Sequence, residues 1–167
     1  MGYWSFWVVE YAMRLTRYSD FALRTLIYLG LSEPRQTSIA EVSRAYGISE
    51  NHLTKVVHHL GQLGLVRTTR GRSGGLRLAR PPEQIIIGQV VRQTEEDLAL
   101  VECFGGGDCT ITQACRLKSV MGEALAAFFA VLDRFTLADF IGPGDGPETA
   151  RLLGLFVTPP NEASSNS

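Results

Sequence analysis

The feature that most constrains the fold of this chain is a pair of predicted helix N-termini only eleven residues apart. Ser38 and Glu41 form the Ser-x-x-Glu pattern of a capping box, and Gly47 is the residue type that most often ends a helix. Ser49 can then cap a second helix, which we predict to run to about Leu63. Two short helices joined by a tight glycine-containing turn predict a helix-turn-helix.

The sequence on either side of this motif completes a winged helix. A longer amphipathic helix precedes it, with Thr16 as a suitable N-cap. Two short strands follow it: the first opens at Leu65 and Val66, and the second alternates Leu76 and Leu78 with arginines. A glycine-rich turn separates the strands. We therefore predict a mainly α protein, with a winged helix-turn-helix DNA-binding domain, a two-stranded β-wing and a long C-terminal dimerisation helix.

Charge is unevenly distributed along the chain, although the net charge is only −1. Residues 13–80 hold eleven Lys or Arg against four Asp or Glu, a net charge of +7. Residues 81–167 hold five against twelve, a net charge of −7. This asymmetry indicates a polyanionic partner for the first half alone. Double-stranded DNA fits that half, and a dimer would recognise an inverted-repeat operator.

The second helix of the motif begins with polar side chains that could reach base edges in the major groove. Asn51 carries an amide that can read adenine, and Glu50 could accept from a cytosine amine or simply favour the helix dipole. Thr54 and Lys55 suit phosphate contacts, which position a protein without reading sequence. The predicted DNA contacts in this helix are Ser49, Glu50, Asn51, His52, Thr54 and Lys55.

The turn of the predicted wing supplies a second DNA-binding element. Its sequence TTRGRSGG includes Arg70, Arg72 and Ser73, which we predict to contact phosphates or enter the minor groove. The glycines there do not form a nucleotide phosphate loop, because no Gly-Lys-Ser/Thr follows and no helix is expected to open.

All three cysteines lie in one glycine-rich stretch, as Cys103, Cys109 and Cys115. The apolar first twelve residues are too short to cross a bilayer and lack the pattern of a secretory signal, so we expect a cytoplasmic protein without membrane association. In a reducing compartment, clustered thiols indicate a metal or redox site rather than structural disulfides. Three thiolates are one ligand short of a closed four-coordinate site.

A long periodic segment follows the cysteines, and we predict a helix over about 112–135. Its apolar positions occupy two sides, so we expect part of it to pack on a second subunit; a core helix of a single domain is the alternative. The expected organisation is an N-terminal extension that is disordered or a mis-assigned start (1–12), the winged helix-turn-helix (13–82), a short helix with the cysteine loop (83–111), the dimerisation helix and a short helix (112–141), and a partly disordered tail (142–167).

Four stretches of this sequence together resemble a known group of regulators. The segments MRLTRYSDFALRTLIYL and GISENHLTKVVHHLGQLGLVRTTRGRSGGLRLARP, the triple-cysteine loop, and ACRLK with LDRFTLADF closely resemble the NsrR-type nitric-oxide-sensing repressors. These repressors belong to a winged-helix regulator family that also includes IscR and RirA. The resemblance covers about residues 13–141 and includes the loop sequences as well as the generic helix-turn-helix.

The resemblance implies a homodimeric repressor whose long helices cross between subunits. It also implies an iron–sulfur cluster bound by Cys103, Cys109 and Cys115, with a 4Fe–4S cluster as first choice and a 2Fe–2S cluster as second. Nitric oxide would be the signal, and cluster loss or nitrosylation would release DNA. Thiolates are the soft ligands that such clusters use, so the residue chemistry agrees with the resemblance.

The resemblance also bears on the fourth ligand. IscR-like members carry a histidine three residues after the last cysteine, whereas this chain has Lys118, which cannot ligate while protonated. In NsrR-like members a carboxylate from the first helix of the partner subunit can fill the position, and the matching residue is Asp20. Asp108 and Glu102 are nearer competitors in sequence, and Asp20 could instead be a charge that favours the helix N-terminus.

Other chemistries stay open for the loop. The same cysteines would serve an iron sensor of the RirA type or a 2Fe–2S redox sensor, and three thiolates with one carboxylate would also satisfy zinc; a simple thiol switch is a further alternative. An enzyme or electron carrier is disfavoured, because the sequence shows no nucleophile–base arrangement, no paired acid–base carboxylates and no Cys-x-x-Cys pair.

Overall fold

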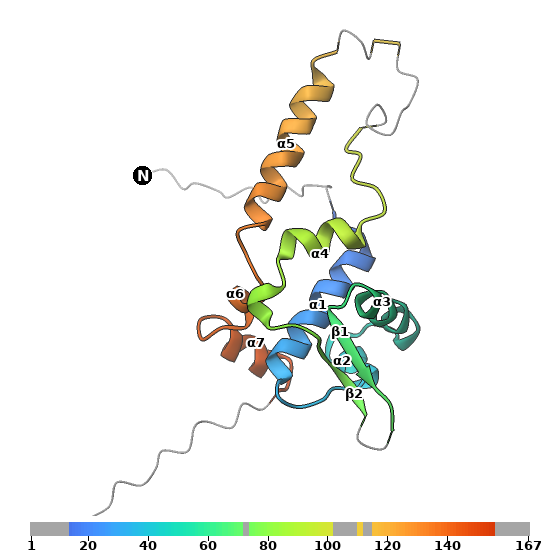
Figure 1. Cartoon of the computed structure of the whole chain (residues 1–167), viewed down its shortest axis with the longest axis vertical. Coiled ribbons are helices and arrows are strands. Elements are labelled where there is room, and N and C mark those ends of the chain that lie inside the picture. The colour runs from blue at the N-terminus through green and yellow to red at the C-terminus, as the bar shows by residue number, and fades with distance from the viewer. Residues whose placement is uncertain (1–13, 72–73, 102–109, 112–114, 156–167) are drawn as a thin grey trace, which may run out of the picture.

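The computed structural model describes residues 14–71, 74–101, 110–111 and 115–155. Its elements in chain order are α1 (Arg17–Ser32), α2 (Ile39–Tyr46), α3 (Glu50–Gln62), β1 (Val66–Thr69), β2 (Gly75–Leu78), the 3-10 turn η1 (Pro82–Gln84), α4 (Ile87–Thr94), α5 (Leu117–Leu132), α6 (Ala138–Ile141) and α7 (Gly146–Leu152) (Figure 1). A mainly helical chain with a two-stranded antiparallel sheet confirms the predicted fold class.

The predicted capping residues set the bounds of the first three helices. Ser38 and Glu41 form a complete capping box, in which each side chain accepts from the backbone N–H of the other residue. Gly47 ends α2 in the left-handed conformation, with φ of 65°. Thr16 caps α1 and Ser49 caps α3, each by accepting a hydrogen bond from a backbone N–H three residues later. Local sequence therefore fixes the helix-turn-helix.

Helix α1 runs through the centre of the winged-helix body (Figure 1). Its Ala22, Leu26 and Leu29 are buried and pack in one core with residues from α3, both strands and α4. Helix α3 buries one apolar face, and a second core lies around Val42 of α2. The buried residues of α3 are Leu53, Val56, Val57 and Leu60. Burial of apolar surface around α1 is therefore what orients α2 and α3.

The wing is an antiparallel hairpin in which Val66 pairs with Leu78 and Arg67 pairs with Arg77. Its root is joined to the loop before α2 by two backbone hydrogen bonds between Thr37 and Leu76, of 3.1 and 2.7 Å. This pairing attaches the wing to the same body that holds the helix-turn-helix, so the two predicted DNA-binding elements are positioned together.

Helix α5 projects beyond the winged-helix body, away from the wing (Figure 1). It spans Leu117–Leu132, so it is shorter at both ends than the predicted 112–135; residues 112–114 lie outside the described part of the chain. Phe129 is the only residue of α5 that is buried in the protomer. The base of α5 is held by α4, because Arg92 makes two hydrogen bonds to Asp133, of 2.6 and 2.7 Å, and lies 4.1 Å from the ring centroid of Phe129.

Helix α7 lies in the segment 142–167, for which the sequence predicts only a partly disordered tail. A turn does end α6, but a helix begins again at Gly146, with Pro147 in its first turn, a position where proline is tolerated. A Cβ atom on Gly146 would lie 2.2 Å from the carbonyl oxygen of Ile141, so this close approach needs glycine. Ala150 is buried, which attaches α7 to the body rather than leaving it as tail.

Candidate nucleic-acid interface and metal centre

The first turns of α3 present the predicted base-reading side chains to solvent. Glu50, Asn51 and His52 are exposed at the N-terminal end of the helix, and Lys55 is exposed one turn later. The Ser49 side chain lies 2.9 Å from Nδ1 of His52, so this pair forms part of the helix cap as well as of the exposed surface. The arrangement is that of a recognition helix with its polar face free.

Thr54 is exposed, but its hydroxyl already donates to the carbonyl oxygen of Glu50 at 2.8 Å. A threonine hydroxyl keeps acceptor capacity in such a bond, and its methyl group stays accessible. Among the wing residues, Arg70 is exposed, whereas Arg72 and Ser73 lie outside the described residues.

Two arginines at the wing donate to backbone carbonyls of neighbouring segments, and the sequence alone does not identify them. Arg80 donates to the carbonyl oxygens of Leu63 and Gly64, both at 3.0 Å, and so satisfies backbone acceptors at the end of α3. Arg77 donates to a backbone carbonyl in the loop before α2. Arg67 lies directly opposite Arg77 on the exposed face of the hairpin. Like charges placed across a sheet destabilise it, which favours an anionic partner for this face.

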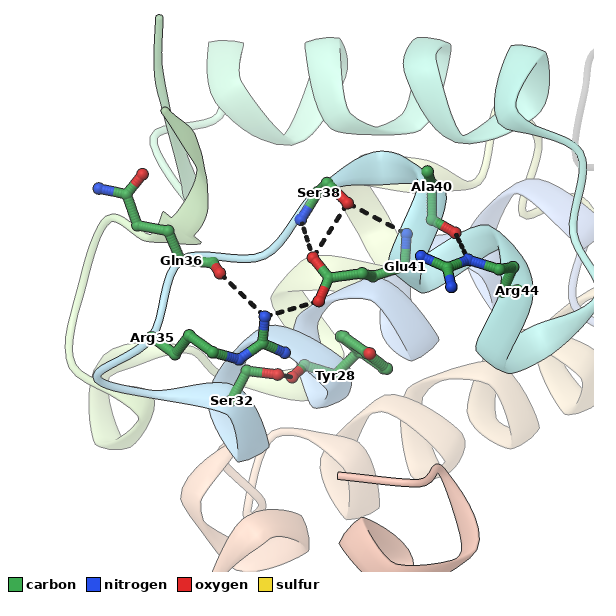
Figure 2. Close-up of polar contacts among 8 residues, drawn as sticks. All are labelled: Tyr28, Ser32, Arg35, Gln36, Ser38, Ala40, Glu41 and Arg44. Carbon is green, nitrogen blue, oxygen red and sulfur yellow. Dashed lines mark hydrogen bonds and ion pairs between the residues drawn. The ribbon is translucent and has the colours of Figure 1, made fainter. Parts of the chain in front are cut away.

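A polar network fixes the N-terminal end of α2 (Figure 2). Arg35 donates to the carboxylate of Glu41 at 2.6 Å and to the carbonyl oxygen of Gln36 at 3.2 Å. Burial opposes ionisation of Glu41, but hydrogen bonds from Ser38 and Arg35 outweigh it and lower its pKa below the ordinary value of 4.5. The sequence signalled the capping box but gave no sign of Arg35, which lies six residues before Glu41.

Of the predicted metal ligands, the structure describes Cys115 and Asp20. Cys115 is a free, half-buried thiol two residues before α5, whereas Cys103 and Cys109 lie outside the described residues. Within the described residues, no group of three or more His, Cys, Asp or Glu side chains is arranged to hold a metal ion. The predicted ligand set is therefore not brought together in the described part of one protomer.

Asp20 lies in the first turn of α1, with 42% of its side chain exposed. One carboxylate oxygen, Oδ1, accepts from Nε of Arg24 at 2.9 Å. The other oxygen, Oδ2, makes no hydrogen bond to a described residue, so it is available to a ligand. The competing residues Asp108 and Glu102 are outside the described residues.

The N-terminal end of α1 is joined to the end of α4, which leads into the cysteine segment. The buried hydroxyl of Thr94 donates to the hydroxyl of Ser19 at 2.8 Å. Glu95 accepts from both the backbone N–H and the hydroxyl of Thr16, at 2.8 and 3.0 Å. These partners are more than seventy residues apart in sequence, so no local pattern could have predicted them.

A cavity of about 260 Å³ with mainly apolar lining lies between α5, the segment after α4 and the start of α1. Leu98, Leu100, Met121 and Phe128 are among its lining residues. Beyond it, several large apolar side chains of α5 or its flanks are exposed in the protomer: Ile111, Leu117, Val120, Val131 and Phe135. Contiguous exposed apolar surface usually marks an interaction site.

Within the described residues, no helix combines the length and the apolar character needed to cross a membrane.

Comparison with known proteins identifies related regulators. The model of the Rrf2 family, described as iron-dependent transcriptional regulator, matches residues 15–143. The HTH-type transcriptional regulator NsrR of Geobacillus kaustophilus is 52% identical over 132 residues, which cover 77% of this chain and 90% of that protein. NsrR of Bacillus subtilis is 51% identical over 132 residues, with the same coverage of each chain.

Solved structures show the same architecture. The global cysteine regulator CymR of B. subtilis superposes with a TM-score of 0.63 at 26% identity, covering 77% of this chain and 95% of that chain. The T. potens IscR structure gives a TM-score of 0.64 at 25% identity, covering 78% and 87%. The relatives are named as transcriptional regulators, a class that is not enzymatic, which confirms the prediction of a regulator rather than an enzyme.

Proposed function

We propose that this chain, which belongs to the Rrf2 family of transcriptional regulators, is a cytoplasmic, homodimeric, DNA-binding repressor of the NsrR type. The observation that carries the proposal is identity of about one half, over most of the chain, to regulators named NsrR. The exposed polar start of α3 and the basic wing supply a surface that suits duplex DNA.

The proposed DNA contacts divide by role. Asn51, Glu50 and His52 would read base edges, while Lys55 and Arg70 would contact phosphates. Ser49, Thr54, Arg72 and Ser73 complete the proposed set. We expect the logarithm of the operator affinity to fall linearly with the logarithm of the salt concentration, because phosphate contacts release counterions.

The proposed dimer would form through α5. Most residues of this helix are exposed in one protomer, and its exposed side chains include Leu117, Val120 and Val131. A helix that is apolar on more than one side needs more cover than one small domain provides. Two copies related by a two-fold axis would place two α3 helices on an inverted-repeat operator.

The proposed cofactor is an iron–sulfur cluster, with 4Fe–4S preferred over 2Fe–2S. Cys103, Cys109 and Cys115 would hold it, with Asp20 of the partner subunit as the fourth ligand. The two ligands that the structure describes fit this role: Cys115 is a free thiol before the long helix, and Asp20 keeps Oδ2 available. When bound, the cluster would supply an iron centre that reacts with nitric oxide.

Arg24 has a defined part in this proposal. Its Nε donates to Oδ1 of Asp20 from one helical turn away, which orients the carboxylate. An oxygen donor is harder than a thiolate and therefore exchanges more readily at iron. Asp20 would then report the state of the site to α1, which contacts α3, the sheet and α4.

The proposal is tested with anaerobically purified protein. Iron and sulfide are measured first, then operator binding is followed by fluorescence anisotropy while nitric oxide is added. We expect binding to weaken as the visible cluster absorption is lost. Asp20→Ala should lower cluster retention or its nitric oxide response, whereas Asp145→Asn, an exposed aspartate whose side chain makes no cap hydrogen bond, should leave both unchanged. Unchanged DNA affinity after complete cluster loss would exclude the proposal.

A second candidate is an iron-responsive regulator that uses the same residues. The Rrf2 family is described as iron-dependent transcriptional regulators, which favours this candidate. Titration with an iron chelator in the absence of nitric oxide separates the two: an iron sensor releases DNA at chelator concentrations that leave a nitric oxide sensor bound. Colourless, zinc-containing protein would instead support the zinc alternative.

A further inference from the structure

Two pairs, each of an aromatic ring and a histidine ring, join α1 to α3, the proposed DNA-reading helix. The ring of Phe21 lies 6.2 Å from that of His52, measured between centroids, at the start of α3. The ring of Tyr18 lies 5.8 Å from that of His59, two turns further along α3. Tyr18 and Phe21 flank Asp20 in sequence, so the proposed ligand belongs to the same first turn of α1 as the two contacts with α3.

Tyr18 also bonds to the backbone of α3. Its phenol oxygen lies 3.3 Å from the carbonyl oxygen of Lys55 and 3.1 Å from Nδ1 of His59. The phenol has one proton, so both contacts are satisfied together only when it donates to Lys55 and His59 donates from Nδ1.

We propose that Tyr18 is a positioning residue that couples the first turn of α1 to the placement of the reading helix. This inference rests on the proposed function, because it concerns how the state of the cluster site reaches α3. Leu26 and its neighbours join α1 to the rest of the fold through non-directional apolar packing. The Tyr18 hydrogen bonds are directional, and one of them ends on the backbone carbonyl of Lys55, whose side chain is a proposed phosphate contact.

The same turn of α1 is bonded to the end of α4 on its other side. Ser19, next to Tyr18, accepts from the buried Thr94 hydroxyl at 2.8 Å. A displacement of this turn therefore acts on Tyr18 directly. Without the phenol hydroxyl, α3 would keep its packing but lose a bond that fixes its position along α1, so less of any displacement would reach the DNA-binding surface.

The experiment compares operator affinity in the cluster-loaded and cluster-free states for matched variants. Tyr18→Phe removes the hydroxyl and keeps the ring, and Tyr28→Phe makes the same change at a tyrosine of α1 whose phenol lies beside Arg35. His59→Leu removes the ring donor, and His58→Leu changes the adjacent exposed histidine. We expect Tyr18→Phe and His59→Leu to reduce the ratio of the two dissociation constants by about threefold to tenfold, the range for one net hydrogen bond. The two controls, Tyr28→Phe and His58→Leu, should keep the wild-type ratio of the dissociation constants.

Nitrogen NMR of the His59 ring provides a second readout, which tests the assigned hydrogen bond itself, whereas the ratio of the two dissociation constants is the readout that a purely structural role would not move. We expect the Nδ1–H form in the wild type and a changed ring signal in Tyr18→Phe. If wild-type protein binds the operator equally well with and without its cluster, the proposed function fails. If the wild-type ratio is large and Tyr18→Phe preserves it, or if His59 carries its proton on Nε2, the role of Tyr18 is overturned and the proposed function stands.

Discussion

At the residue scale, Glu41 contributes most to fixing the start of α2. Its carboxylate accepts from the Ser38 backbone at 2.7 Å and from Arg35 at 2.6 Å (Figure 2). The first contact satisfies a backbone donor that the helix itself leaves free, and the second connects α2 to the loop after α1. Because α2 supports α3, one carboxylate helps to determine where α3 begins.

The lowered pKa of Glu41 gives a pH prediction with a definite sign. The folded pKa is below the ordinary value of 4.5, so the carboxylate stabilises the fold above that pH and loses this contribution as the pH falls through the folded pKa. At pH 7, Glu41→Gln should lower the free energy of unfolding by about 1 kcal/mol, because charge-assisted hydrogen bonds are weakened. Chemical denaturation at a series of pH values should show this difference shrinking below pH 4.5. A difference that grows on acidification would contradict the assigned role.

Contacts at this scale were predictable only when the partners are close in sequence. Ser38 and Glu41 are three residues apart, and their residue types alone indicated the capping box. Tyr18 and His59 are forty-one residues apart, and nothing in either local sequence marks the contact. The bonding of His59 depends on how α1 crosses α3, which the local sequence does not determine.

At the element scale, the attachment of α5 to α4 determines where the long helix points. Arg92 binds both carboxylate oxygens of Asp133, and Gly88 lies directly beside that carboxylate. A Cβ atom at Gly88 would lie 2.1 Å from Oδ1 and 3.1 Å from the backbone nitrogen of Asp133. The glycine therefore allows α4 and the end of α5 to approach closely.

Gly88→Ala should disrupt this attachment. We expect it to lower the free energy of unfolding by about 1–2 kcal/mol, because overpacking outweighs the better helix propensity of alanine. Gly61→Ala is the matched control within α3, since its Cβ would come no closer than 3.8 Å to another atom, and it should be neutral or stabilising. Thermal unfolding followed by circular dichroism measures both. Equal melting temperatures for the two variants would show that the close approach does not matter.

The bounds of a helix could be predicted from the sequence where capping residues mark its ends. Thr16, Ser38, Ser49 and Gly47 set the bounds of α1 to α3, and all were identified in advance. Helix α5 has no side-chain cap hydrogen bond at its start, and its apolar pattern continues into the preceding segment, so its length was overestimated. Helix α7 was missed because its glycine-rich start resembles a terminator, and only its packing against the end of α6 shows otherwise.

At the scale of the whole molecule, the apolar side chains of the winged helix are mostly buried, whereas several of those on α5 are exposed. The winged helix has a core around α1, whereas α5 leaves apolar side chains exposed and lies next to an apolar cavity. Sequence periodicity predicted this surplus of apolar positions. Which positions face the body and which remain free could not be read from the sequence, because it depends on the angle at which α4 holds α5.

The exposed face of α5 yields the prediction that tests the dimer most directly. Val120 is 49% exposed in the protomer, so Val120→Glu should leave the fold of the protomer intact. In the proposed dimer the same carboxylate would be buried against a second copy without a partner, at a cost of several kcal/mol. We expect sedimentation velocity to show a shift from dimer to monomer, with loss of binding to a two-half-site operator. A single half-site should then bind the variant and wild type with similarly weak affinity.

Leu152→Glu is the control for this substitution. Leu152 is 71% exposed on α7, outside α5, so the same change there should preserve the dimer and its operator binding. If Val120→Glu stays dimeric while Leu152→Glu dissociates, the interface lies at the α7 end of the molecule. The spacing of the two reading helices would then have to be set from that end, and an operator with a different half-site separation would be bound.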